Sequence, residues 1–120
     1  MAKKRLLESA SQAFKKGQFD ISEALYRRIL EIMPKEPIAN YAIALSLKNR
    51  GRFSECTTYF KTALEINPKN GNYWLAYVGA LLSNGEIEKA KVVLATAASY
   101  GIAAKYLEKS YEQLRRIQKI

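Results

Sequence analysis

The segment GRFSECTTYFKTALEINP, residues 51–68, decides the fold because it repeats an earlier part of the chain. Shifted back by 34 residues it aligns with GQFDISEALYRRILEIMP, residues 17–34. A glycine, a phenylalanine, a leucine, a glutamate, an isoleucine and a proline coincide in the two copies. A weaker third copy, GEIEKAKVVLATAASYGI, begins another 34 residues later at Gly85. A fixed period of this length predicts a stacked array of helix–turn–helix units.

The composition predicts one soluble domain. The chain has 120 residues, of which 48% are apolar and 26% charged, which is ordinary for a globular protein. Its single cysteine, Cys56, cannot form an internal disulfide and fits a reducing compartment. The basic N-terminus lacks the apolar run of a signal peptide, and the apolar run at residues 74–82 is too short to span a bilayer. We therefore expect a cytoplasmic protein with no membrane contact.

Helical spacing of apolar residues predicts seven helices and no strand. Glycines or prolines end the first six, at Gly17, Pro34, Gly51, Pro68, Gly85 and Gly101. Pro37 suits the first turn of the third helix.

We expect Asp20 to cap the second helix, with Glu23 completing a capping box. Ser54, at the same place one period later, is expected to cap the fourth helix. The seventh helix, about residues 103–120, has a narrow apolar stripe and a charged remainder, as the terminal helix of an open array requires.

The 34-residue pattern resembles the tetratricopeptide repeat family. That family has a small residue where the two helices of a pair cross, a glycine at the turn, alternating aromatic and small residues, and a closing proline. In this chain the pattern is met by Ala44, Gly51, Phe53, Cys56, Phe60, Ala63 and Pro68 in the second repeat, by Ala10, Gly17, Phe19, Ser22, Tyr26 and Pro34 in the first, and by Trp74, Gly85, Ala90, Leu94 and Ala97 in the third.

The resemblance implies an all-α, right-handed α-solenoid of three helix–turn–helix pairs with a C-terminal capping helix. It implies a single domain over residues 1–120, with repeats at about 3–36, 37–70 and 71–104 and the capping helix at about 103–120. Val78 stands where a small residue is usual, so the third pair is expected to cross at a different distance.

A weaker resemblance connects residues 12–34 and 73–102 with the repeat region of some bacterial glycosyl-, methyl- and sulfotransferases. It implies an accessory module of a larger transferase.

Nothing in the sequence predicts catalysis. The chain has no histidine and one cysteine, which removes the commonest general base and the commonest zinc ligands. Cys56 occupies a packing position and is expected to be a buried thiol. The glycines recur with the repeat and do not form a phosphate-binding loop. We therefore expect no enzyme activity, no metal and no cofactor.

The predicted site is the concave groove, which the first helix of each pair lines in such arrays. It is expected to bind a protein or peptide with apolar anchors and acidic flanks. The alternatives are that these side chains pack between repeats, or that the groove pairs with a second copy of the chain. Helical spacing assigns to this wall Leu7, Ser11, Phe14, Lys15, Ile38, Tyr41, Leu45, Lys48, Asn49, Asn72, Leu75 and Leu82.

Two kinds of ligand are not expected. A subset of the family grips the acidic tail of heat-shock chaperones with lysines, asparagines and an arginine; the matching places here hold Leu7, Ser11, Ala42, Asn72 and Ala76.

The net charge of +9, from 20 Lys and Arg against 11 Asp and Glu, favours acidic partners and is compatible with weak nucleic-acid binding. Basic residues gather at the turns of the first two repeats, but without interleaved aromatic residues they do not predict specific RNA binding.

Overall fold

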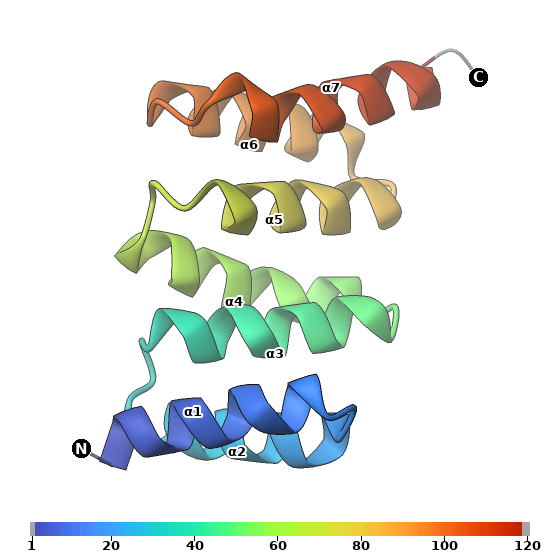
Figure 1. Cartoon of the computed structure of the whole chain (residues 1–120). Helices are drawn as coiled ribbons and strands as arrows, with labels where there is room; N and C mark the ends of the chain where they lie inside the picture. Colours follow the sequence, from blue (N-terminus) through green and yellow to red (C-terminus); the bar gives the residue numbers. More distant parts are fainter. Residues whose placement is uncertain (1, 119–120) are drawn as a thin grey trace.

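Seven α-helices stack in an elongated array in the computed structural model, which describes residues 2–118 (Figure 1). The array is all-α, with three helical pairs and a capping helix, as the repeat pattern predicts. Lys119 and Ile120, expected at the end of the last helix, lie outside the described residues. The helices are α1 (Ala2–Lys15), α2 (Phe19–Ile32), α3 (Pro37–Asn49), α4 (Phe53–Ile66), α5 (Gly71–Ser83), α6 (Ile87–Ser99) and α7 (Ala104–Gln118).

The turn within each pair depends on a glycine with a positive φ angle. Gly17, Gly51 and Gly85 have φ angles of 77°, 74° and 76°. Only glycine adopts this left-handed conformation without a steric penalty. Gly101 has the same conformation between α6 and α7, with a φ of 79°, which confirms the left-handed helix end expected there.

The expected caps of α2 and α4 are wrong. Both helices begin two residues earlier than predicted, at Phe19 and Phe53, and neither has a side-chain cap. Asp20 and Ser54 therefore lie inside the first turn, where they no longer occupy the capping position.

Side-chain caps are found on α3 and α5 instead. The Glu36 carboxylate accepts a hydrogen bond from the Ile38 amide at 2.9 Å. The Asn70 side chain accepts one from the Tyr73 amide at 3.2 Å. Pro37 occupies the first turn of α3 as predicted. These caps fix where the helices that line the concave face begin.

Small residues bring the two helices of each pair together. Ala10 of α1 faces Ser22 of α2, whose hydroxyl donates a 2.8 Å hydrogen bond to the Ala10 carbonyl. Ala44 and Cys56, the same places in the second pair, are fully buried, and burial raises the pKa of the Cys56 thiol. In the third pair Val78 replaces the alanine, and α5 and α6 run less closely together than the helices of the other pairs.

The capping helix α7 packs on α5 and α6. The Tyr106 ring of α7 lies against Gly71, the first residue of α5. A Cβ atom at Gly71 would lie 2.5 Å from the ring of Tyr106. The missing side chain therefore sets how near α7 comes to the array.

Gly71→Ala should destabilise the chain by about 1–3 kcal/mol, because the added methyl group forces the Tyr106 ring and α7 outward. Urea unfolding followed by circular dichroism measures the change. Gly79→Ala is the matched control on the same helix, since its Cβ would meet only the flexible end of Lys48, at 3.1 Å from Nζ. It should stabilise the chain by about 0.5–1 kcal/mol through helix propensity. Equal effects of the two variants would contradict the packing of Tyr106 on Gly71.

Candidate protein-binding face

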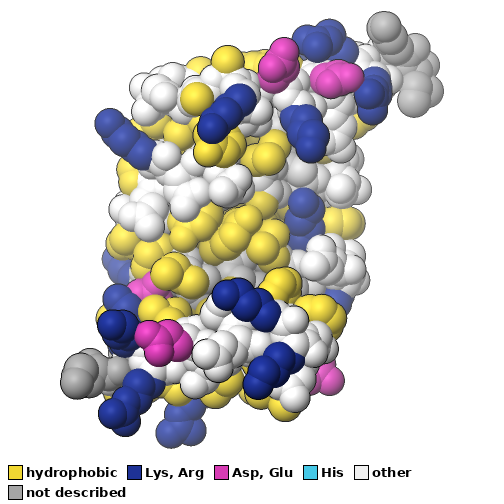
Figure 2. All heavy atoms as spheres, in the orientation of Figure 1, with side chains coloured by type: hydrophobic (Ala, Val, Ile, Leu, Met, Phe, Trp, Pro, Cys, Tyr) yellow, Lys and Arg dark blue, Asp and Glu magenta, His cyan; other side chains and the backbone are white. Residues whose placement is uncertain are grey.

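The first helix of each pair and α7 form one face of the array. Figure 1 shows α1, α3, α5 and α7 in front, and Figure 2 shows the surface of this face in the same orientation. Apolar side chains gather in a band across its middle, while Lys and Arg side chains lie over the helices at both ends (Figure 2). Two cavities on this face meet over α3, and a third adjoins one of them between α5 and α7.

The first cavity, which we call the aromatic slot, lies between the first helical pair and α3. One lining residue comes from α1, and the others come from α2, from α3 and from the residue just after α3. Its volume is about 540 Å³ and its walls are mainly apolar. Phe14, Phe19 and Ile38 form part of the wall although about half of each side chain is exposed. The slot is lined by Phe14, Phe19, Ser22, Glu23, Tyr26, Ile38, Tyr41, Ala42, Leu45, Ser46, Asn49 and Arg50.

The second cavity, which we call the basic groove, lies between α3, α5 and α7 and has a volume of about 670 Å³. Three cationic side chains reach it, Lys48 from α3 and Lys109 and Arg116 from α7. Its single carboxylate, on Glu112, pairs with Arg116 at 2.9 Å. The groove is lined by Tyr41, Leu45, Lys48, Asn72, Leu75, Ala76, Gly79, Lys109, Glu112, Gln113 and Arg116.

Tyr41 and Leu45 line both cavities. The Tyr41 ring is 4.5 Å from that of Tyr73 and 6.1 Å from that of Phe60, centroid to centroid. Burial, with a smaller effect of Tyr73, raises the pKa of Tyr41, so its hydroxyl stays neutral. The rings of Tyr73 and Phe60 pack near Tyr41, which is partly buried and lines both cavities.

The structure brings eight of the twelve predicted groove residues to these cavities. Phe14, Ile38, Tyr41, Leu45 and Asn49 line the aromatic slot, and Tyr41, Leu45, Lys48, Asn72 and Leu75 line the basic groove. The four others do not line either of them: Leu7, Ser11, Lys15 and Leu82.

The placement of Leu82 on the groove wall is wrong. Its side chain is 5% exposed and belongs to the core. Because α5 is apolar nearly all round, periodicity alone does not tell its buried face from its groove face.

The residues that α7 contributes were missed: Lys109, Glu112, Gln113 and Arg116. Its apolar stripe shows which side is buried, but the charged remainder looks like a solvated surface. The available signal was its place in the array. A capping helix that packs on α5 continues the row of first helices, so its polar side adjoins their concave wall.

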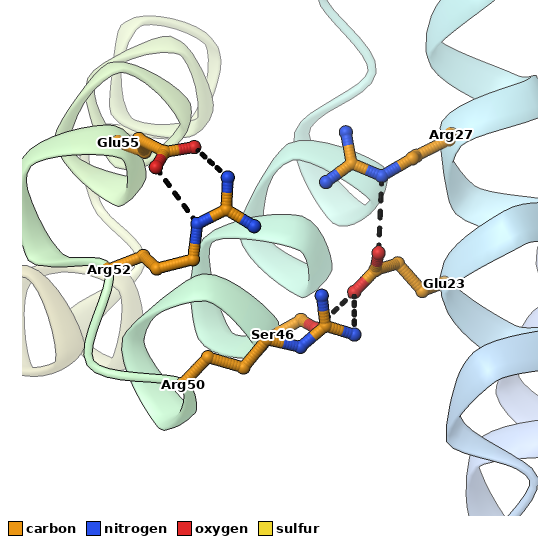
Figure 3. Close-up of polar contacts among 6 residues, drawn as sticks. All are labelled: Glu23, Arg27, Ser46, Arg50, Arg52 and Glu55. Atoms are coloured by element: carbon orange, nitrogen blue, oxygen red, sulfur yellow. Dashed lines mark hydrogen bonds and ion pairs between the residues drawn. The ribbon is translucent and has the colours of Figure 1, made fainter.

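A network around Glu23 joins the first helical pair to the second (Figure 3). The Glu23 carboxylate accepts hydrogen bonds from the Ser46 hydroxyl and from Arg27, and it pairs with Arg50 at 2.9 Å. The Ser46 hydrogen bond lowers the pKa of the Glu23 carboxyl, burial opposes this, and Arg27 and Arg50 add to the lowering. The network fixes the rim of the aromatic slot, which Glu23, Ser46 and Arg50 line.

Sequence comparison agrees with this architecture. A profile of the tetratricopeptide repeat matches residues 50–101, which hold the second repeat from its turn onward and both helices of the third pair. The chain is a tetratricopeptide-repeat domain. None of the curated proteins matches it in sequence.

Solved tetratricopeptide-repeat structures share the arrangement of the whole domain. The Sgt2 domain of Aspergillus fumigatus is 18% identical over 98% of this chain and 80% of its own, with a TM-score of 0.78. The TPR2B domain of yeast Sti1, in a complex with Hsp70, is 16% identical over 95% of this chain and 96% of its own, with a TM-score of 0.79. At these identities the likeness concerns the fold alone.

A mutant of the O-GlcNAc transferase of Thermobaculum terrenum is 25% identical to this tetratricopeptide-repeat domain, with a TM-score of 0.71. The match covers 81% of this chain but 19% of the transferase. The likeness is therefore to a small part of that protein.

Within residues 2–118, no helix is long and apolar enough to cross a membrane.

Glu23→Gln should lower stability by about 1–2 kcal/mol near neutral pH, because it leaves Arg27 and Arg50 without their carboxylate. The folded pKa of Glu23 lies below its unfolded value, so its contribution is present above about pH 4.3 and is lost as the pH falls through the folded pKa. The difference between wild type and variant in urea unfolding should therefore shrink below that pH. Glu55→Gln removes the carboxylate from an exposed pair with Arg52 and should change stability much less. A difference for Glu23→Gln that does not depend on pH would contradict the role of the ionised carboxylate.

Proposed function

We propose that this domain is a non-catalytic protein-interaction module that binds a peptide or partner segment on its concave face. The observation that carries the proposal is the sharing of Tyr41 and Leu45 between two adjoining cavities. A contiguous, partly exposed apolar surface bordered by polar groups is typical of an interaction site. We place this function in the cytoplasm, consistent with the single buried cysteine.

Tyr41→Ala and Leu45→Glu should each abolish partner capture, with a loss of about 2 kcal/mol or more in binding free energy, as for central aromatic anchors. Affinity pull-down with mass spectrometry identifies the partners, and titration of each one measures the loss. Lys61→Ala, on the exposed side of α4, is the control and should bind as wild type. Thermal unfolding must show that the variants remain folded. If every captured partner still binds both groove variants, the proposed function is wrong.

We also propose that the acidic tail of heat-shock chaperones is not the ligand. The support comes from this chain's own residues at the places that grip the tail in a subset of the family. Ala42 and Ala76 provide no charge there, and Leu7 and Ser11 do not line the cavities. The fold shared with the Sti1 domain does not decide the matter, since it is shared at 16% identity.

A heat-shock tail peptide should give no saturable heat of binding with this domain in calorimetry. The Sti1 domain, which is known in complex with Hsp70, serves as the positive control in the same buffer. A micromolar dissociation constant for this domain would overturn the exclusion.

A second candidate function is that of an accessory module in a larger transferase. It is favoured by the match to the Thermobaculum terrenum enzyme, which covers most of this chain and a small part of that one. A catalytic domain encoded in the same reading frame would support it. In that case the concave face would bind the substrate protein or another part of the enzyme.

Binding of nucleic acid is less well supported than binding of protein. The basic residues at the turns of the first two repeats are Lys15, Lys16, Lys48, Arg50 and Arg52. Two of these five are paired with carboxylates, Arg50 with Glu23 and Arg52 with Glu55. Their charge is thus partly neutralised, which weakens the attraction of a phosphate backbone.

A further inference from the structure

The two junctions between successive helical pairs carry different side chains. The 34-residue shift places Tyr73 where the first junction has Ala39, and Tyr77 where it has Ile43. The centroid of the Tyr73 ring lies 4.5 Å from that of Tyr41. The Tyr77 ring stacks on that of Phe60 in α4, with 5.8 Å between centroids. Ala39 and Ile43 are fully buried and much smaller. Tyr73 and Tyr77 are thus packed into the second junction, whereas large apolar side chains that line the aromatic slot at the first junction are about half exposed.

The wall of the aromatic slot is apolar and poorly covered. Phe14, Phe19 and Ile38 are 57%, 59% and 48% exposed. The rings of Phe14 and Phe19 meet edge to face, with 5.2 Å between centroids and 66° between planes. Three large apolar side chains around one opening leave hydrophobic surface in water that an inserted apolar side chain would cover.

The charges beside the slot are unbalanced. The basic groove continues from the slot through Tyr41 and Leu45. Lys48 and Lys109 form no ion pair with any residue of the part of the chain that the structure describes. The groove's carboxylate, Glu112, is already paired. With a net charge of +9, a second copy of the chain is repelled and an acidic segment is attracted.

We propose that the aromatic slot receives one large apolar side chain, of phenylalanine or leucine size, from a partner peptide whose acidic residues lie against Lys48 and Lys109. This rests on the proposed function and adds the chemistry of the ligand. The apolar side chain fixes the peptide between α1 and α3, and the carboxylates fix its direction along α3 towards α7. The recognition needs no free chain end, because both contacts are made to side chains.

Synthetic peptides that are acetylated and amidated test this chemistry without terminal charges. One series pairs a phenylalanine with two aspartates at several spacings. Matched series replace the phenylalanine by alanine or the aspartates by lysines. In fluorescence anisotropy the phenylalanine–aspartate series should bind best, and each replacement should weaken binding about tenfold or more. Equal affinity of the phenylalanine and alanine series, or of the acidic and basic series, would overturn the proposal.

Variants of the chain locate the two contacts. Ala42→Leu narrows the slot and should weaken the phenylalanine–aspartate peptide about tenfold, while leaving the alanine–aspartate peptide unchanged. Ala95→Leu, an equal change at an exposed place on α6, is its control. Phe14→Ala removes an exposed part of the slot wall and should also weaken only the phenylalanine peptides. Phe14→Ala therefore tests binding in the slot even if Ala42→Leu does not fold.

Lys48→Glu should abolish the preference for acidic over basic peptides. Lys61→Glu makes the same change of charge on α4, away from the groove, and should keep that preference. A preference unchanged by Lys48→Glu would show that the groove does not hold the acidic residues, which contradicts the proposal.

The outcomes separate this proposal from the function on which it rests. If Ala42→Leu and Phe14→Ala leave the phenylalanine peptides unaffected while Tyr41→Ala stops partner capture, the slot proposal is wrong and the proposed function stands. If Tyr41→Ala leaves captured partners bound, the proposed function fails. If Ala42→Leu instead lowers the mass seen in light scattering, a second copy fills the slot and the acidic-peptide proposal is wrong.

Discussion

The close crossing of two helices at small residues is the constraint on which the rest of the array depends. Ala10 and Ser22 in the first pair, and Ala44 and Cys56 in the second, are buried where the helices meet. Small side chains let two helical backbones approach, and close packing then fixes their angle. Because the crossing recurs with a constant period, every first helix faces the same way. Their outward sides together form one continuous face instead of separate patches.

The binding face arises where the repeats differ, while the framework arises where they agree. The turn glycines recur in all three repeats, and the small crossing residues recur in the first two. Leu45, by contrast, becomes Gly79 one period later, and Phe14 becomes Lys48. These differences make the cavity beside the first helical pair aromatic, and the cavity between α3, α5 and α7 basic. A solenoid stabilised by contacts between neighbouring repeats tolerates such variation, because each exposed position affects only its own junction.

The sequence predicts the framework well because its signals are local. A glycine at a turn and a proline after a helix act on the residues beside them, so the number and order of the helices are predicted correctly. The exact first residue of a helix is less certain, since Asp20 and Ser54 remain good capping residues two positions away from the caps. The error is of two residues, and it removes both expected caps.

The candidate site is predicted less completely because it depends on packing between distant elements. Leu82 was placed on the wrong side of a helix that is apolar nearly all round. Lys109 and Arg116 reach the groove only because α7 packs on α5 as another first helix does. The aromatic slot is lined by side chains from three helices, among them Phe14 of α1, Tyr26 of α2 and Ile38 of α3. Such side chains enclose a cavity only at a particular spacing of the backbones, and periodicity does not report that spacing.

The central claim is that partners bind on the face formed by α1, α3, α5 and α7. Amide chemical-shift mapping of the isotopically labelled chain, titrated with a captured partner, tests it most directly. The account predicts that the largest shifts fall on α3 around Tyr41 and Leu45 and extend to the facing sides of α1, α5 and α7. Shifts concentrated on α4 and α6, which line neither cavity, would place the partner on the opposite face and contradict the account.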